Sequence, residues 1–370
     1  MRHAANALQV DLGEVWKRRN LDDKEKASRA DHELRRALFF GPLHSINRVT
    51  HPRDLTVLVP ELFAVLLALL PNLKHLAFST TPTTFSVGVG MADVPPAAMS
   101  ALGVTKLPLR VLEAGFKPRY LSRVTPDLES LTCGRVGGLE ESGFPRLKSL
   151  RIRGTRVNRH NLGRIVESCP ESLSSFTYEA SGFLETSIDS GLDHVVQPSD
   201  AVTHLSKFHD TLKSLRLDLR FHTRTPRDTE IDNLPNLEDF TVLEDLFLAT
   251  SAIYNFNNLE LPHGDSLVDI LPPNIVSLTL AKTWWLRAQR LRLGRLGLAE
   301  HKRCNPERFR KLKFVRCDTR EVCFDSSVKE AFGEVGIDLV YEEFPRQDLS
   351  YNDRDGGYFR QSAWWEGDGL

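Results

Sequence analysis

The sequence predicts an α/β fold in which short parallel strands, joined by helices and turns, stack one after another along the chain. The first observation is a phrase that recurs, clearest at residues 145–152, where leucines alternate with polar residues to give a strand with one apolar face. The second is proline at the boundaries between helical and strand patterns. One such strand cannot bury its apolar face alone, whereas stacked copies bury it continuously.

Copies of this phrase recur along most of the chain. Each has the Leu-x-x-Leu-x-Leu core of a leucine-rich repeat, and a repeat of this kind fixes the architecture. The predicted fold is therefore an α/β leucine-rich-repeat solenoid, a curved parallel sheet with helices and turns on its convex side. The clear copies cover residues 71–78, 126–133, 145–152, 211–217, 235–242 and 273–280, and the weaker ones cover residues 109–112, 173–178, 243–248 and 309–314.

The repeats divide the chain into three predicted regions. Residues 1–50 form an N-terminal helical cap, residues 51–344 the solenoid, and residues 345–370 a polar C-terminal tail. The cap contains a predicted helix over residues 21–40, and such a cap is needed because a terminal repeat would otherwise expose its apolar face. We expect the tail to be poorly ordered or to fold over the end of the stack.

The first repeat has the order helix, proline turn, strand. Residues 60–70 are predicted to form a helix that Pro71 ends, because proline cannot continue the helical hydrogen-bond ladder. Residues 73–78 then form a strand. The inner side of the helix is predicted to carry four leucines: Leu62, Leu66, Leu69 and Leu70.

Later repeats differ in the length of their return segments. The strands starting at Leu109, Leu128 and Leu147 are 19 residues apart, which leaves room only for turns or a 3₁₀ piece. Wider spacing then leaves room for helices over 157–169, 201–208, 266–271, 284–301 and 328–332, and a last strand covers 339–341. The inward residues are predicted to be Leu162, Ile165 and Val166 in the first of these helices, and Leu286, Leu291 and Leu293 in the basic helix 284–301.

Charge and cysteine content limit the classes of function. The 48 basic and 49 acidic residues give a net charge of −1, so we expect no binding to nucleic acid or to an anionic membrane. The basic stretch 287–295 is accordingly predicted to be the outer side of an amphipathic helix. Five cysteines without a C-x-x-C pair argue against a disulfide framework and a zinc site, and predict buried small apolar residues and a cytoplasmic or nuclear location.

No catalytic pattern is found in the sequence. There is no Gly-x-Ser-x-Gly elbow, and His204 and His209 lack the spacing and intervening glutamate of a zinc helix. Residues 88–90 have the sequence Gly-Val-Gly but lack the Gly-Lys-Ser/Thr of a phosphate loop. We therefore expect no enzyme activity, no cofactor, no metal and no membrane segment, since the most apolar run, 62–70, is too short to cross a bilayer.

The candidate binding residues are those that a repeat strand directs into the concave face, between its second and third apolar positions. They are small or basic, with no acid among them, and so suit a protein partner with an acidic or phosphorylated segment. They are Thr132, Arg151, Thr177, Arg216, Thr241, Thr279 and Lys313.

The phrases at residues 70–76, 234–237 and 267–280 resemble the divergent leucine-rich repeats of fungal F-box proteins. The resemblance covers roughly residues 55–320. It implies a substrate receptor of a ubiquitin ligase, in which an N-terminal F-box binds a Skp-type adaptor and the repeats hold the substrate. No F-box is evident here, because the nearest match, residues 59–62, leads straight into the first repeat strand and is assigned to that repeat's helix.

Two hypotheses of function follow from these patterns. The first is a non-enzymatic protein-binding module that uses the concave face, as a ubiquitin-ligase substrate receptor does. The second is a leucine-rich-repeat regulator of a small GTPase or another enzyme. The irregular spacing of the strands disfavours the second, because such regulators resemble one another in having regular repeats of about 28 residues.

Overall fold

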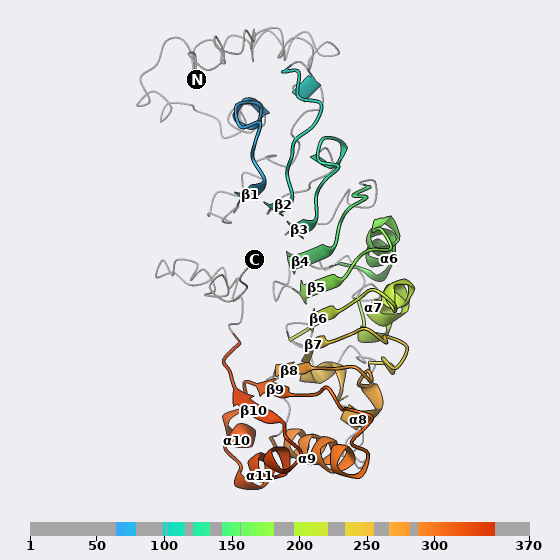
Figure 1. Ribbon diagram of the computed structural model, residues 1–370, viewed down its shortest axis with the longest axis vertical. Coiled ribbons are helices and arrows are strands. Elements are labelled where there is room, and N and C mark those ends of the chain that lie inside the picture. Colours follow the sequence, from blue (N-terminus) through green and yellow to red (C-terminus); the bar gives the residue numbers. More distant parts are fainter. Residues whose placement is uncertain are drawn as a thin grey trace, which may run out of the picture. The chain divides into compact units, whose positions relative to one another are not determined.

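The computed structural model describes residues 64–78, 99–100, 102–114, 121–133, 143–155, 157–180, 196–220, 234–254, 266–281 and 288–344. In these residues the chain has an α/β fold with an open, all-parallel sheet of ten strands that pair in chain order, β1 to β10 (Figure 1). The predicted α/β class is confirmed. The predicted cap, the phrase at 59–62, the glycines at 88–90 and the tail at 345–370 lie outside the described residues.

Short strands alternate with turns and helices along the described chain. The strands are β1 His75–Phe78, β2 Val111–Ala114, β3 Ser130–Cys133, β4 Ser149–Thr155, β5 Ser175–Ala180, β6 Ser214–Asp218, β7 Asp245–Ala249, β8 Ser277–Ala281, β9 Phe314–Cys317 and β10 Asp338–Tyr341. The helices are η2 Leu121–Arg123, α6 Arg159–Ser168, α7 Pro198–Leu205, η5 Ser206–Phe208, η6 Thr250–Ala252, α8 Ser266–Ile270, α9 Ala288–Cys304, α10 Arg320–Cys323 and α11 Ser326–Glu334.

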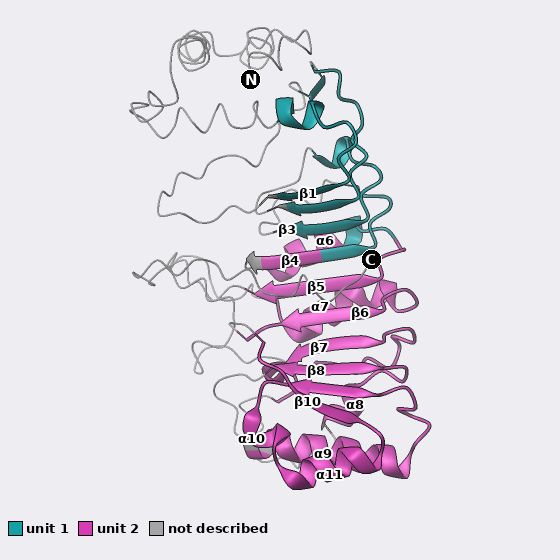
Figure 2. Ribbon diagram, turned by 60° about the vertical axis from the view of Figure 1, so that its left-hand side comes forward, with its two compact units in different colours: residues 1–150, 167–170 teal, residues 151–166, 171–370 magenta. Residues whose placement is uncertain are grey.

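The chain divides into two compact units, shown in different colours in Figure 2. Unit 1 comprises residues 1–150 and 167–170, and unit 2 comprises residues 151–166 and 171–370. In unit 1, β2 pairs in parallel with β1 and β3, and the short 3₁₀ helix η2 precedes β3, as the 19-residue spacing predicts. In unit 2, the strands from β5 to β10 pair successively in parallel.

The first apolar residue of the phrase closes a turn before each of the strands β1, β3, β4, β7, β8 and β9. The N–H of Leu147 donates to the carbonyl of Phe144 at 3.2 Å, and the N–H of Leu312 donates to the carbonyl of Phe309 at 3.1 Å. All four of these side chains are buried. The strand itself begins two residues later, so the first leucine anchors the turn while the second and third leucines face the core.

One backbone carbonyl after most of these turns links a repeat to the next repeat in the chain. The carbonyl of Glu244 accepts the N–H of Val276 at 2.8 Å and that of Ser277 at 3.0 Å. Because both donors belong to the next phrase, the bond pair fixes the alignment of one strand on its neighbour. The same pair of bonds forms at the carbonyls of Lys74, Arg110, Glu129, Ser174, Lys213 and Val276.

The predicted strand over residues 237–242 is wrong. The N–H of Phe240 donates to Leu237 at 3.0 Å, and the N–H of Leu243 donates to Phe240 at 3.1 Å, so this stretch makes two consecutive turns. The strand is β7, which the sequence indicates only as a weak copy. Phe240 is buried before Leu243 in the same way that Phe144 is buried before Leu147.

Most of the predicted helices are confirmed, with different bounds. Helix α6 buries Leu162, Ile165 and Val166 as expected, and α7, α8 and α11 lie where return segments are predicted. The helix before β1 differs, because Ala64, Val65 and Leu67 are buried while Leu66, Leu69 and Leu70 are exposed.

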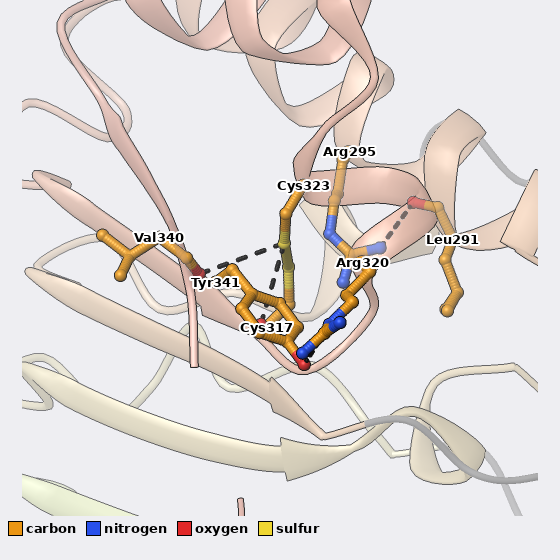
Figure 3. Close-up of a disulfide and its surroundings, with 7 residues drawn as sticks. All are labelled: Leu291, Arg295, Cys317, Arg320, Cys323, Val340 and Tyr341. Atoms are coloured by element: carbon orange, nitrogen blue, oxygen red, sulfur yellow. Dashed lines mark hydrogen bonds between the residues drawn. A yellow bond between two sulfur atoms is a disulfide. The ribbon is translucent and has the colours of Figure 1, made fainter. Parts of the chain in front are cut away.

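Helix α9 also buries a different set of residues from the one predicted. Leu291 is buried, but Leu293 is exposed, and the guanidinium of Arg295 is enclosed with only 1% of the residue accessible. Its Nη1 donates to the carbonyl of Leu291 at 3.0 Å (Figure 3), and burial lowers the pKa of Arg295 to about 10. A side chain at the neighbouring Gly294 would collide with the buried hydroxyl of Tyr254, so this helical position admits no Cβ.

The cysteines depart from the expectation that all of them are buried and unpaired. Cys317 and Cys323 are joined by a disulfide beside β10 (Figure 3). Cys133 and Cys169 are buried thiols outside any disulfide, and burial raises the pKa of Cys133 to about 12. Cys304 is free and exposed at the end of α9.

The turn at residues 237–243 can be tested with two adjacent substitutions. Phe240→Ala should destabilise the protein by about 3–5 kcal/mol, because it leaves a cavity where a buried ring closes the turn. Thr241→Ala should leave the midpoint of thermal unfolding close to that of the wild type, since Thr241 is exposed. Comparable losses in both variants, measured by circular dichroism, would contradict this assignment of the turn.

Candidate protein-binding surface

One row of side chains crosses the sheet of unit 2 in exact register. Thr177 in β5 aligns with Arg216 in β6, which aligns with Phe247 in β7, and the row continues through β8 and β9. The residues on either side of each row position in β5 and β6 are buried leucine or aromatic side chains that face the core. We call this surface the polar face of unit 2. It comprises the row residues Thr177, Arg216, Phe247, Thr279 and Arg316 together with the charged side chains of β4 and β5 that cluster with Arg216.

The structure supports the predicted row position for three of the candidate residues and corrects two. Thr177, Arg216 and Thr279 share the row. Thr241 instead lies in the turn before β7, where Phe247 takes its place in the row. Lys313 lies one residue before β9, beside the linking carbonyl of Val276, and Arg316 takes its place.

The remaining two candidates lie on other strands. Thr132 is in β3 of unit 1 and aligns with Glu113 in β2, so the row there contains an acid, contrary to the prediction. Arg151 is in β4 of unit 2 and takes part in an ion cluster with β5 and β6.

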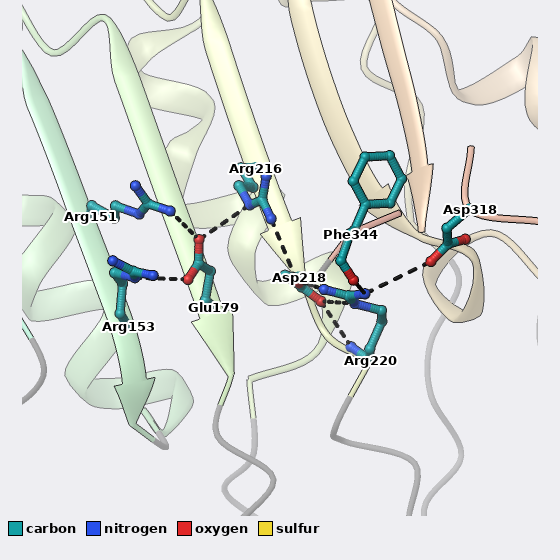
Figure 4. Close-up of polar contacts among 8 residues, drawn as sticks. All are labelled: Arg151, Arg153, Glu179, Arg216, Asp218, Arg220, Asp318 and Phe344. Atoms are coloured by element: carbon teal, nitrogen blue, oxygen red, sulfur yellow. Dashed lines mark hydrogen bonds and ion pairs between the residues drawn. The ribbon is translucent and has the colours of Figure 1, made fainter. Parts of the chain in front are cut away.

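The centre of that cluster is Glu179, whose side chain is only 10% exposed. Arg151 Nη2 lies 2.6 Å from Glu179 Oε1, and Arg153 Nε lies 3.0 Å from Glu179 Oε2. Arg216 Nε lies 3.3 Å from Oε1 on the other side (Figure 4). One carboxylate therefore holds arginines from two neighbouring strands.

The cluster continues at the carboxyl ends of β6 and β9. Asp218 aligns with Glu179 in the sheet register, and its carboxylate accepts two hydrogen bonds from Arg220, at 2.8 Å from Nε and 2.7 Å from Nη2. The remaining terminal nitrogen of Arg220 donates to the carbonyl of Phe344 at 3.1 Å and lies 3.8 Å from Asp318 (Figure 4). Such a bidentate pair fixes both the position and the plane of the guanidinium.

Burial and charge act in opposite directions on these groups. Burial raises the pKa of Glu179, but the attraction of Arg151, Arg153 and Arg216 outweighs it and holds the pKa below the ordinary 4.5. Burial lowers the pKa of Arg216 despite the nearby Glu179 and Asp218. Burial also opposes the charge on Arg220, yet its bonds to Asp218 keep its pKa above the ordinary value.

The side chains of Phe247 and Ala281, which we call the aromatic shelf, adjoin the cluster on the polar face. The guanidinium carbon of Arg216 lies 3.6 Å from the centre of the Phe247 ring, a cation–π contact. The ring of Phe344 meets Phe247 edge-on, with centroids 5.4 Å apart. Phe247, Phe344 and Ala281 of β8 form a small buried group on this face.

The cluster has a small excess of positive charge. Four arginines (Arg151, Arg153, Arg216 and Arg220) face three carboxylates (Glu179, Asp218 and Asp318), an excess of one. The side chains of Arg151 and Arg153 remain 34% and 25% exposed, more than the 10% of Glu179 between them. The sequence analysis missed Arg153, Glu179, Asp218 and Arg220, although an arginine or acid two residues beyond a row position in the same strand is a usable signal.

No protein-family model and no curated protein matches this chain. Among the described residues, no helix combines the length and apolar character needed to cross a membrane. Within the same ranges, no group of three or more histidine, cysteine, aspartate or glutamate side chains could hold a metal ion. A proposal of function therefore rests on the geometry of the polar face.

Removing the central carboxylate should destabilise unit 2. Glu179→Ala should lower the free energy of unfolding by about 3 kcal/mol, because it leaves several arginines close together without their shared partner. Glu129→Ala is the matched control, since Glu129 also bridges two cations but is more exposed, and its midpoint in urea should stay near that of the wild type. Equal losses in the two variants would contradict a central role for Glu179.

The same carboxylate should contribute to acid sensitivity. Its pKa is lower in the folded than in the unfolded chain, so its stabilisation is full above the unfolded value of 4.5 and is lost as the pH falls through the folded pKa. Glu179→Gln removes this titration, so the free energy of unfolding should fall less than in the wild type between about pH 5 and about pH 3. Asp210→Asn, which changes an exposed acid, should keep the wild-type slope.

Proposed function

We propose that this chain is a non-enzymatic protein-recognition module built from leucine-rich repeats, and that it binds an acidic or phosphorylated segment of a partner protein on the polar face of unit 2. The observation that supports the proposal most directly is the cluster around Glu179. There, Glu179 holds Arg151 and Arg153 in position (Figure 4), and both side chains stay partly exposed.

Fixed arginines suit carboxylate and phosphate groups. The guanidinium donors form a planar fork that matches two oxygens at once, and less conformational entropy is lost on binding when the side chain is already positioned. Glu179 positions Arg151 and Arg153 through bonds of 2.6 and 3.0 Å. A ligand oxyanion would approach the outer edges of these two side chains.

The repeated strands support a broad rather than a pocket-like contact surface. Each strand contributes one row residue beside the row residue of the neighbouring strand, and side chains from several strands can contact one extended partner. The resemblance to fungal F-box proteins makes a substrate receptor of a ubiquitin ligase the specific form of this proposal. The alternative, a regulator of a small GTPase or another enzyme, would use the same face.

Affinity purification of the tagged chain, read by mass spectrometry, tests the proposal. A variant with Arg151→Gln and Arg153→Gln should recover at least tenfold less of a partner that the wild type captures. The reason is that two partly exposed charges are removed while Arg216 still pairs with Glu179. Arg303→Gln is the control, since Arg303 is an exposed arginine on α9 that pairs with the exposed acids Glu300 and Glu334.

The partners recovered separate the specific forms of the proposal. Recovery of a Skp-type adaptor and a cullin with the wild type supports the ubiquitin-ligase form. Recovery of a small GTPase supports the alternative. Equal capture by the wild type and the Arg151→Gln, Arg153→Gln variant would contradict binding at the polar face.

A further inference from the structure

We infer that the polar face of unit 2 recognises an extended peptide in which two acidic residues are followed by an aromatic one, and that the chain's own residues Glu342, Glu343 and Phe344 occupy this site. This inference rests on the proposed function and specifies the ligand. It follows from the contacts that these three residues make after β10 ends at Tyr341.

The segment leaves the sheet at β9 and reaches the shelf on β7. The N–H of Glu342 donates to the carbonyl of Cys317 at 2.9 Å, which is the last backbone bond to the neighbouring strand. Two residues later, Phe344 packs on Phe247 of β7, and its carbonyl accepts the hydrogen bond of Arg220. The segment therefore lies across strands with which it does not pair (Figure 4).

Each of the three residues has its own partner on the protein. Glu342 Oε2 lies 3.8 Å from Arg316 Nε, and Arg316 is a row residue of the polar face. Glu343 Oε1 accepts hydrogen bonds from Arg320 at 3.0 Å and from the hydroxyl of Tyr341 at 2.7 Å. These are the elements of peptide recognition: two charge contacts, an aromatic anchor and one bond to the peptide backbone.

The shelf has the composition of an aromatic anchor site. The rings of Phe247 and Phe344 meet at an angle of 75°, while Arg216 covers a face of the Phe247 ring at 3.6 Å. Arg220, held by Asp218, supplies a donor for the peptide carbonyl next to the aromatic ring. An aromatic side chain and its own carbonyl are thus both recognised, which a purely apolar patch would not achieve.

The acidic contacts of the segment are weak enough to be exchanged. The side chains of Arg320 and Glu343 are 68% and 71% exposed, and pairs of this kind contribute little to stability in water. A partner peptide with the same pattern could form equivalent contacts. It could also extend to Arg151 and Arg153, which the chain's own segment does not contact among the described residues.

The test measures binding of a labelled peptide by fluorescence anisotropy. The probe has the sequence Tyr-Glu-Glu-Phe-Pro-Arg, copied from residues 341–346. Two full-length variants release the site: Phe344→Ala removes the aromatic anchor, and Glu342→Arg with Glu343→Arg repels the segment from Arg316 and Arg320. Because a tethered segment competes at a high effective concentration, both variants should bind the probe at least tenfold more tightly than the wild type.

Two controls identify the site. A probe with alanine in place of phenylalanine should bind each variant at least tenfold more weakly. Adding Phe247→Leu to the Glu342→Arg, Glu343→Arg variant should reduce binding of the original probe to the same extent, since leucine keeps the shelf apolar but removes the ring. Circular dichroism establishes that each variant is folded.

The outcomes decide between this inference and a purely structural role for the segment. If Phe344→Ala fails to fold, the charge-reversal variant decides, because it changes only two partly exposed side chains. Probe affinity equal to that of the wild type in the folded variants would overturn the inference. If the Arg151→Gln, Arg153→Gln variant nevertheless loses its partner, the proposed function would stand without it.

Discussion

The structure depends on one backbone arrangement that recurs in several of the described repeats: an apolar residue closes a turn, and the carbonyl of the next residue accepts two N–H groups from the following repeat. Glu244 shows it, with bonds of 2.8 and 3.0 Å to Val276 and Ser277. The buried N–H and C=O groups of a parallel sheet need hydrogen-bond partners, and these bonds provide them where one strand meets the next. The arrangement sets the register, and the register determines which side chains form the polar face.

The leucine phrases were predictable because they are local. A pattern of apolar residues within eight positions is visible in the sequence, and it identifies β1 to β9 either clearly or as weak copies. The tenth strand, β10, was expected separately at residues 339–341. The exception at residues 237–242 shows the limit. Pro235, Asn236 and Leu237 have the spacing of a repeat phrase, but the turn that leads into the strand is the next one. It is closed by the bond from Leu243 to Phe240, with both side chains buried, and β7 follows it.

The candidate site was only partly predictable because its contacts are distant in sequence. Arg151 and Glu179 are 28 residues apart, and Arg220 and Phe344 are 124 apart, so no local pattern links them. A register error also has large consequences. The phrase that contains β9 was assigned three residues early, at 309–314, and this selected Lys313, which lies at the linking turn, in place of Arg316, which lies in the row.

A cluster that contains its own acids can still bind an acidic ligand. Without Glu179 and Asp218, the arginines at the ends of β4 and β6 would repel one another and adopt many conformations. Glu179 and Asp218 reduce that repulsion and fix the guanidinium planes, while the cluster keeps an excess of positive charge and the side chains of Arg151 and Arg153 stay partly exposed. In the proposed function, the buried carboxylates form the internal half of the binding surface, because they convert a flexible group of charges into fixed hydrogen-bond donors.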